Sequence, residues 1–228
     1  TELAHEKNVE AVRQIVRDEE IAPTPFTQLE DNILYYIMLG SLRREHLAAV
    51  GFPEAYYLTS EQKISVINAL TDANHPCEMA ADLYALSKIR NDFTMDHFLF
   101  CGVTGNIGLA WKEASEVMGF SLEQCCIPGY EMNGVPSHHC IRDAIRGKDI
   151  ICTDSLPADL LSASRGCTVD LAAMKLANEG AILNPCPPFY RGEEVSNDVI
   201  DSDYFVGYEF KKHLLTVQQA IMVYCLTH

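Results

Sequence analysis

Residues 180–195 read Gly-Ala-Ile-Leu-Asn-Pro-Cys-Pro-Pro-Phe-Tyr-Arg-Gly-Glu-Glu-Val, and this stretch decides the fold. The short apolar run Ala181–Leu183 predicts a buried strand, and the prolines that follow make the next segment a stiff loop. That loop carries a thiol, Cys186, and a guanidinium, Arg191. In open α/β sheets, ligands bind in the crevice outside the carboxyl ends of the strands. The stretch therefore predicts a functional loop at the carboxyl end of a strand.

From residue 63 onward, short apolar runs alternate with helical stretches. The apolar runs are Lys63–Ile67, His97–Cys101, Asp149–Cys152, Ala181–Leu183 and Tyr204–Val206. The helical stretches are His75–Ile89, Asn106–Met118, Ser137–Arg146 and Val169–Asn178. Such alternation is typical of parallel strands joined by crossover helices. It predicts an α/β fold in which helices flank a parallel sheet.

A helical region precedes this sheet, and a helix follows it. In residues 1–62 the apolar residues recur at helical spacing and no strand–helix alternation is visible, so we expect a small helical N-terminal cap. Residues 63–210 form the expected α/β lobe, and residues 211–228 form the expected C-terminal helix.

The composition limits the partners of the chain. It has 228 residues, with 17 Lys and Arg against 32 Asp and Glu, and a formal charge of −15. This charge argues against nucleic acid or an anionic membrane as a partner, because both are negative themselves. No apolar stretch approaches the ~20 residues that span a bilayer. The nine cysteines occur in a long chain without a signal-peptide pattern, so we expect free thiols in a reducing cytoplasm.

A second motif lies upstream, where residues 66–72 (Val-Ile-Asn-Ala-Leu-Thr-Asp) lead into His75-Pro76-Cys77-Glu78. In this order the two motifs resemble those of the ornithine carbamoyltransferases, whose Cys-Leu-Pro loop is commonly followed by Arg-Gly-Glu-Glu-Val. The resemblance covers residues 64–226 and implies a Rossmann-like amino-acid-binding lobe of the carbamoyltransferase superfamily. It also implies that Leu214–Leu226 packs back on the cap and that the site lies between lobe and cap.

The resemblance implies roles for individual residues. In the family the residue that matches His75 polarises the carbamoyl carbonyl, and those that match Asn106 and Asp154 contact the amino-acid substrate. We therefore expect three catalytic residues, His75, Glu78 and Cys186, and four substrate-binding residues, Asn106, Asp154, Pro187 and Arg191. The expected partner is a small-molecule amino acid, and we expect no metal and no cofactor.

The sequence departs from the family pattern where the family binds phosphate. Glu78 stands in the place of a Gln, so an anion that repels phosphate replaces an amide that could donate to it. The 74 residues before His75 contain no Ser-Thr-Arg-Thr-Arg motif, and the run 211–215 (Lys-Lys-His-Leu-Leu) lacks the family's arginine. Residues 155–160 replace the family's Ser-Met-Gly loop. We expect a truncated, diverged enzyme that acts on an ornithine-like amino acid, in specialised amino-acid metabolism, without carbamoyl phosphate.

Other interpretations remain open. The chain could be a non-catalytic homologue that binds an amino acid or a partner, and we expect a homo-oligomer in either case. The glycines of Gly102–Gly108 resemble a dinucleotide-binding turn, with Glu123 about twenty residues on, which would indicate a nicotinamide-dependent oxidoreductase. The run His138-His139-Cys140 is a weaker candidate for a metal cluster, because neighbouring residues on a helix point to different sides.

Overall fold

The computed structural model describes residues 74–227, with side chains as far as residue 221. The expected cap, residues 1–62, and the expected strand Lys63–Ile67 lie outside the described residues. The same holds for the packing of the terminal helix on the cap and for a site between cap and lobe. A compact unit extends to Leu215, so it includes most of the described chain.

The described chain alternates between strands and helices. The strands are β1 (His97–Cys101), β2 (Ser121–Cys125), β3 (Ser137–His138), β4 (Ile150–Thr153) and β5 (Ile182–Pro185). The α-helices are α5 (Pro76–Ile89), α6 (Asn106–Met118), α7 (Ile141–Ala144), α8 (Leu171–Met174), α9 (Asn197–Ile200), α10 (Gly207–Lys211) and α11 (Leu214–Thr227). Two 3₁₀ helices span Phe93–Met95 and Ala163–Cys167.

The five strands form one parallel sheet in the order β3-β2-β1-β4-β5. Phe98 on the central strand β1 lies opposite Leu122 on one side and Ile150 on the other. The prediction that the runs containing β1, β4 and β5 are neighbouring parallel strands is confirmed. The order reverses between β1 and β4, and in open α/β sheets such a switch point opens a crevice at the carboxyl ends of the strands.

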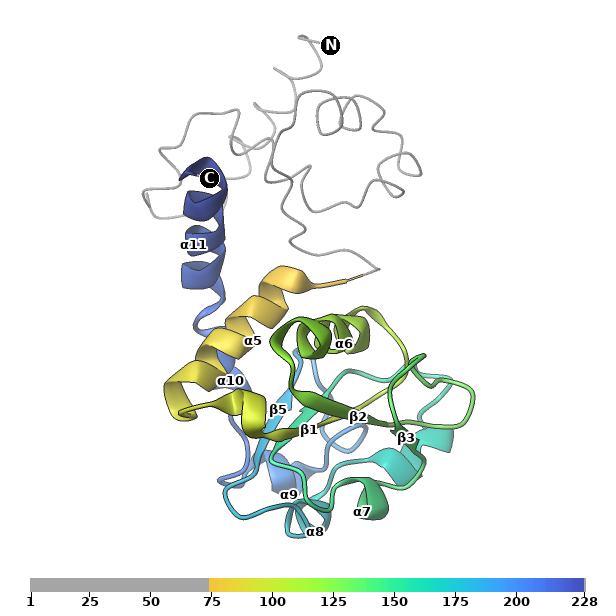
Figure 1. Ribbon diagram of the computed structural model, residues 1–228. Coiled ribbons are helices and arrows are strands. Elements are labelled where there is room, and N and C mark those ends of the chain that lie inside the picture. The colour runs from red at the N-terminus through yellow and green to blue at the C-terminus, as the bar shows by residue number, and fades with distance from the viewer. Residues whose placement is uncertain (1–73, 228) are drawn as a thin grey trace, which may run out of the picture. The chain divides into compact units, whose positions relative to one another are not determined.

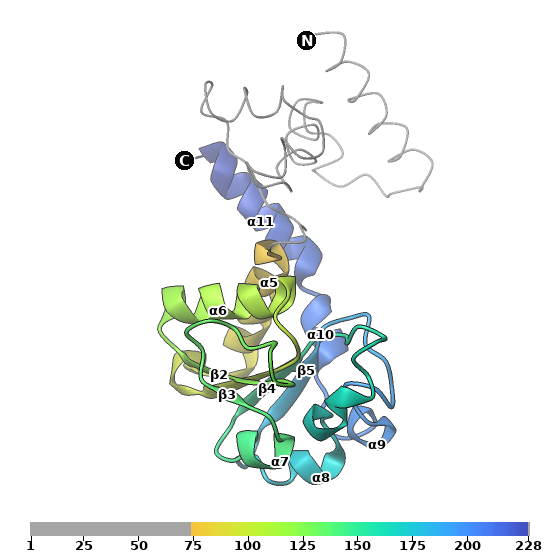
Figure 2. The ribbon, with the colours of Figure 1, turned by 90° about the vertical axis from the view of Figure 1, so that its right-hand side faces the viewer.

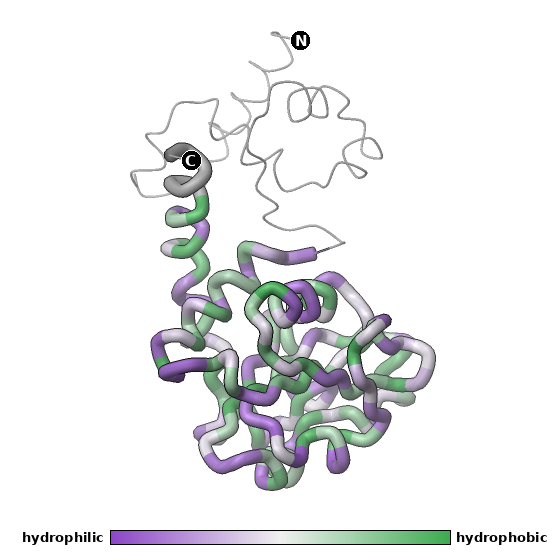
Figure 3. The backbone as a smooth tube through the Cα atoms, in the orientation of Figure 1, coloured by the Kyte–Doolittle hydropathy of each residue, from purple (hydrophilic) through white to green (hydrophobic). Residues whose placement is uncertain are grey.

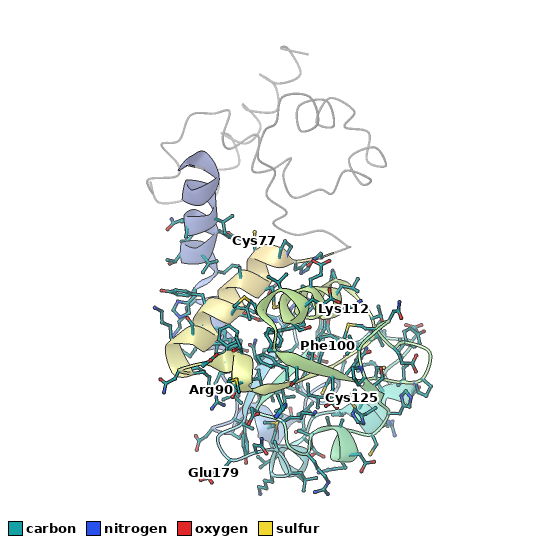
Figure 4. The ribbon with its side chains drawn as sticks, viewed as in Figure 1. Cys77, Arg90, Phe100, Lys112, Cys125 and Glu179 are labelled. Atoms are coloured by element: carbon teal, nitrogen blue, oxygen red, sulfur yellow. The ribbon has the colours of Figure 1, made fainter. Side chains whose placement is uncertain are left out.

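Helices cover both faces of this sheet (Figures 1 and 2). Helices α5 and α6 lie on one face, and the short helices α7, α8 and α9 lie on the other. Successive side chains of a strand point to opposite faces, so Phe98 and Phe100 face the α5–α6 side while Leu99 joins the core on the other side. The tube in Figure 3 alternates between hydrophobic and hydrophilic segments, and in Figure 4 Phe100 lies in the interior beneath α6. The sheet therefore has two buried faces, as parallel sheets require.

Some predicted elements were wrong in type or length. Residues 137–146 were expected to be helical, but they contain the edge strand β3 and only the short helix α7. The helix expected at 169–178 shrinks to α8. Strand β2 was not predicted, and the expected strand at 204–206 makes a single bridge, between Leu183 and Phe205. None of the helices in the described part of the chain is long and apolar enough to cross a membrane.

Candidate functional site

The N-terminus of α5 carries the first group of candidate residues. His75 is the N-cap residue and Pro76 occupies the first helical turn, where its missing N–H costs nothing. The amide of Met79 donates to the His75 carbonyl at 3.0 Å and closes that turn. Glu78 lies in the same turn, near the positive end of the helix dipole, and Asp82 follows four residues later on the same face. The helix thus presents two carboxylates side by side.

A buried lysine joins these carboxylates. Lys211, the last residue of α10, places its Nζ 2.8 Å from Glu78 Oε1 and 2.9 Å from Asp82 Oδ1. Asn184 on β5 donates from Nδ2 to Asp82 Oδ2 at 2.9 Å. Because α10 packs against both α5 and β5, the three elements converge on one charged group.

Two further candidates reach Glu78. The Cys186 thiol, just beyond β5, donates from Sγ to Glu78 Oε1 at 3.4 Å, and His75 Nδ1 lies 3.3 Å from Glu78 Oε2. We call His75, Glu78, Asp82, Asn184, Cys186 and Lys211 the Lys211 cluster. Asp154 follows β4, and its charge interacts with those of His75, Glu78 and Lys211. The structure therefore brings three predicted site residues into contact, His75, Glu78 and Cys186, and places Asp154 near enough for its charge to interact with that of Glu78.

The charges of the Lys211 cluster shift one another. Burial raises the pKa of Glu78, but the Lys211 ammonium more than offsets this, so the pKa of Glu78 lies below its usual value. Burial dominates at Asp82, whose pKa stays raised although Lys211 opposes the shift. Burial lowers the pKa of Lys211, yet Asp82 and Glu78 reverse this and hold it well above its ordinary value. The ammonium is therefore permanently charged at neutral pH.

The thiol and the neighbouring aspartate are pushed toward their neutral forms. Burial raises the pKa of Cys186 far above its usual value, with Lys211 opposing and Glu78 reinforcing the shift. Burial also raises the pKa of Asp154, against the hydrogen bond from the Ser155 amide at 2.9 Å. Since the thiolate is the nucleophilic form of cysteine, Cys186 is a hydrogen-bond donor here and not an activated nucleophile.

The other three predicted site residues have other contacts. Asn106 begins α6, and its Oδ1 accepts from the Ile107 amide at 2.8 Å. The Pro187 carbonyl lies 3.7 Å from Cys186 Sγ, and the Pro187–Pro188 peptide bond is cis. Arg191 is half exposed and pairs with Asp201 at 2.8 Å. The Arg191 guanidinium also donates to the Asn197 carbonyl at 3.1 Å, so both of its described partners lie outside the Lys211 cluster. The binding roles of these three residues stay predictions.

Sequence reasoning missed Lys211, Asp82 and Asn184 as parts of the site. One signal could have pointed to them: Glu78 and Asp82 lie four residues apart on a mostly apolar helix, so both carboxylates face the same way and need a cation. No local pattern identifies which lysine supplies it, because Lys211 is 129 residues from Asp82.

Packing explains two of the glycines in the Gly102–Gly108 turn, which follows β1. A Cβ on Gly108 would lie 2.8 Å from the Phe100 ring, and one on Gly102 would lie 3.0 Å from it. Glu123, the candidate ribose-binding acid, is bound by Lys148 and by His138. Packing therefore accounts for Gly102 and Gly108, and ion pairing accounts for Glu123, without a dinucleotide.

A small pocket lies near this turn and apart from the members of the Lys211 cluster. Its lining comes from the ends of β1 and β2, from the 3₁₀ helix Ala163–Cys167 and from Leu156 and Glu194. It includes four cysteines, Cys101, Cys125, Cys126 and Cys167. All eight cysteines with described side chains are free. The pocket thus presents thiols and not the predicted catalytic groups.

Comparisons with known proteins agree with this geometry. The profile of the family "Aspartate/ornithine carbamoyltransferase, Asp/Orn binding domain" matches residues 97–225. The ornithine carbamoyltransferase of Methylococcus capsulatus is 30% identical over 182 residues, which are 72% of this chain and 61% of that protein. That of Paracidovorax citrulli is 31% identical over 73% of this chain and 60% of its own length. The chain thus spans about three fifths of the length of these relatives.

Solved structures show the same fold. Ornithine carbamoyltransferase from Burkholderia thailandensis superposes with a TM-score of 0.69 at 27% identity, over 76% of this chain and 61% of that one. An N-acetyl-L-ornithine transcarbamylase gives a TM-score of 0.65 at 17% identity, over 89% and 76% of the two chains, which is a likeness of fold alone. With its parallel sheet, its strand-end residues and the matching profile, the chain belongs to the aspartate/ornithine carbamoyltransferase family.

Proposed function

We propose that this chain is a diverged enzyme of the carbamoyltransferase family that acts on an ornithine-like amino acid without carbamoyl phosphate. The observation that carries the proposal is the charge balance around Lys211. Two acids, Glu78 and Asp82, pair with the buried Lys211 ammonium, and the charge of a third acid, Asp154, also interacts with it. The balance favours a second cation, such as a substrate amine, and disfavours a phosphate.

Glu78 supplies the clearest argument against phosphate. Its carboxylate is 15% exposed and ionised at neutral pH, because the Lys211 ammonium outweighs the effect of burial on its pKa. Lys211, which contacts it, is already paired with two carboxylates at 2.8–3.1 Å. A phosphate bound there would meet an ammonium that is already paired and a carboxylate that repels it. It would therefore lack the charge-assisted hydrogen bonds, worth roughly 1.5–3 kcal/mol each, that stabilise a bound phosphate.

His75 supplies the chemistry that the cluster can support. Its Nδ1 faces the Glu78 carboxylate, which orients the ring and leaves Nε2 for a substrate atom. An imidazole oriented by a carboxylate is a common general acid–base device. In this proposal His75 moves the proton, Glu78 holds the ring, Cys186 donates its thiol hydrogen bond and Asp154 holds the amine of the amino acid.

A non-catalytic homologue that binds an amino acid is the second candidate, and one observation favours it. The lowered pKa of Glu78 makes this carboxylate a weak base, and its oxygens are already engaged by Lys211, Cys186 and His75. Such a cluster can hold a ligand without transferring a proton. Turnover of an amino acid that the protein binds distinguishes the two candidates.

We also propose a reducing compartment such as the cytoplasm, and a homo-oligomer. The free thiols support the first proposal, because buried unpaired cysteines are typical of proteins that fold under reducing conditions. Membership of the family supports the second. Light scattering of the purified chain measures the oligomeric state directly.

A thermal-shift screen tests the proposed function. Amino acids with a side-chain amine should stabilise the protein, and a ligand at 100 times its dissociation constant should add about 2.7 kcal/mol to the free energy of unfolding. The variant Asp154→Asn should lose this stabilisation. The matched control Asp159→Asn, at an exposed aspartate five residues on, should keep it. Saturable stabilisation by carbamoyl phosphate, with none by amino acids, would refute the proposal.

A further inference from the structure

We propose that Cys126, Glu131 and His139 form a binding site for a divalent transition metal, with a donor set best suited to zinc. These residues carry a thiol, a carboxylate and an imidazole, the three ligand types that zinc sites use. Their ligand atoms all lie within 4.8 Å of one another. The site sits beyond β2, whereas the Lys211 cluster joins α5, α10 and β5, so the two are separate.

The spacing of the ligand atoms suits a tetrahedral ion. With metal–ligand distances of about 2.0–2.3 Å, neighbouring ligands of a tetrahedral zinc lie about 3.3–3.7 Å apart. His139 Nε2 and Glu131 Oε1 are 3.6 Å apart. The Cys126 thiol lies within 4.8 Å of both atoms.

Two of the three ligands, His139 and Glu131, are held in place by a second contact. The His139 Nδ1 lies 2.8 Å from the Cys126 carbonyl, and because a carbonyl only accepts, Nδ1 carries the proton. The lone pair is thereby left on Nε2, which faces Glu131. Metal-binding histidines commonly show this arrangement, with the second ring nitrogen bonded to a backbone carbonyl. The Glu131 carboxylate accepts from the Gly129 amide at 2.9 and 3.1 Å.

The backbone that carries the ligands is fixed by the sheet. The amide of Cys126 donates to the His138 carbonyl at 2.9 Å, which extends the pairing of β2 with β3 and sets Cys126 beside His139. Glu131 lies in the loop between the same two strands. The ligands are therefore brought together by parallel pairing, which explains why the run 138–140 alone was a poor candidate.

Charge and access also fit a divalent ion. A thiolate and a carboxylate together neutralise a 2+ ion, and the imidazole adds no charge. The side chains of Glu131 and His139 are 38% and 47% exposed, so an ion can enter from solvent, while Cys126 is buried at its inner end. Three protein ligands leave a fourth position for water or a small ligand.

Cobalt(II), which takes the zinc geometry and absorbs light, tests the site in the full reduced chain. We expect one cobalt per chain and a thiolate-to-metal charge-transfer band. Single replacements Cys126→Ser, Glu131→Gln and His139→Gln should each weaken binding at least about tenfold. The controls Cys140→Ser and His138→Gln alter the two sequence neighbours of His139, a thiol and an imidazole outside the group, and should bind within about twofold of the parent chain.

The alternative is that Glu131 and His139 form only an exposed ion pair, which needs no thiol. A wild-type chain without the band, a band that survives Cys126→Ser, or equal loss in Cys140→Ser would overturn the proposal. Since Cys126 is buried, folding of each variant is checked by the fluorescence of Trp111, the single tryptophan. Glu131→Gln changes an exposed side chain and keeps the test decisive if Cys126→Ser misfolds.

Discussion

Replacing Lys211 by methionine removes the one cation of the Lys211 cluster and keeps most of the side-chain volume. The side chain of Lys211 is 16% exposed, and the carboxylates it leaves behind are 4% exposed at Asp82 and 15% exposed at Glu78. These acids lie four residues apart on α5, so they also repel each other once the ammonium is gone. Removing one partner of a buried ion pair lowers the free energy of unfolding by about 3–5 kcal/mol.

Protonation of Asp82 limits this cost and makes it depend on pH. Without Lys211 only the hydrogen bond from Asn184 is left to oppose burial, so the folded-state pKa of Asp82 rises further above its unfolded value. An acid with a raised folded pKa destabilises the fold increasingly as pH rises from the unfolded pKa to the folded pKa. Each pH unit above the ordinary aspartate pKa of about 3.9 adds 1.36 kcal/mol to the free energy of keeping a carboxyl protonated. Keeping one carboxyl neutral therefore costs about 4 kcal/mol at pH 7 but only about 1.5 kcal/mol at pH 5.

Urea unfolding followed by Trp111 fluorescence measures both quantities. We expect Lys211→Met to lower the free energy of unfolding by about 3–5 kcal/mol at pH 7. At pH 5 this loss of stability should be smaller by about 2–3 kcal/mol. The neighbouring Lys212, which is 66% exposed and pairs with Glu209, gives the matched control. Lys212→Met should cost less than about 1 kcal/mol at either pH. Equal costs for the two variants, or no dependence on pH for Lys211→Met, would refute the account of the cluster.

The same structure predicts the effects of two further substitutions and the reactivity of one thiol. Burial raises the pKa of Glu78, but its charged and hydrogen-bonded neighbours, Lys211 first among them, lower it by more, so Glu78→Gln should destabilise the protein at neutral pH. Urea unfolding should show that the difference in stability between the variant and the parent chain vanishes as the pH falls below the usual glutamate pKa. Glu78→Gln should also abolish activity on the true substrate without creating affinity for carbamoyl phosphate; full activity would reduce Glu78 to a helix-end residue. The raised pKa of Cys186 predicts slower alkylation by iodoacetamide at neutral pH than a cysteine peptide shows, measured by peptide mass spectrometry. Gly108→Ala should cost about 1–3 kcal/mol in the same urea assay, because the new methyl meets Phe100 at 2.8 Å and Met132 at 3.1 Å; an unchanged midpoint would contradict this.

The fold could be predicted where one face or both faces of an element are apolar. The run His97–Cys101 and the helix Asn106–Met118 were predicted with the bounds that the structure shows. Strand β2 could not be predicted, because Gln124 is fully buried although polar. Its amide is satisfied by Gly102, Tyr130 and Met132, all of them backbone partners supplied by the folded chain. A buried glutamine therefore resembles a surface residue when only the sequence is known.

The candidate site could be predicted at strand and helix ends, but its charge balance could not. The motifs at His75 and Cys186 pointed to the same sheet edge, and the structure joins them through Glu78. Lys211 was noted only as a replacement for a family arginine, since its role depends on α10 packing against α5. Tertiary packing also decides that Arg191 pairs with Asp201. Ion pairs between distant segments have no local signature.

Calorimetric titration with L-ornithine, L-norvaline and carbamoyl phosphate tests the central claim most directly. Norvaline lacks only the side-chain amine of ornithine, so it isolates the contribution of the acids around Lys211. We predict saturable binding of ornithine, at least about tenfold weaker binding of norvaline, equivalent to about 1.4 kcal/mol, and no binding of carbamoyl phosphate. Saturable binding of carbamoyl phosphate together with equal affinities for the two amino acids would contradict the account.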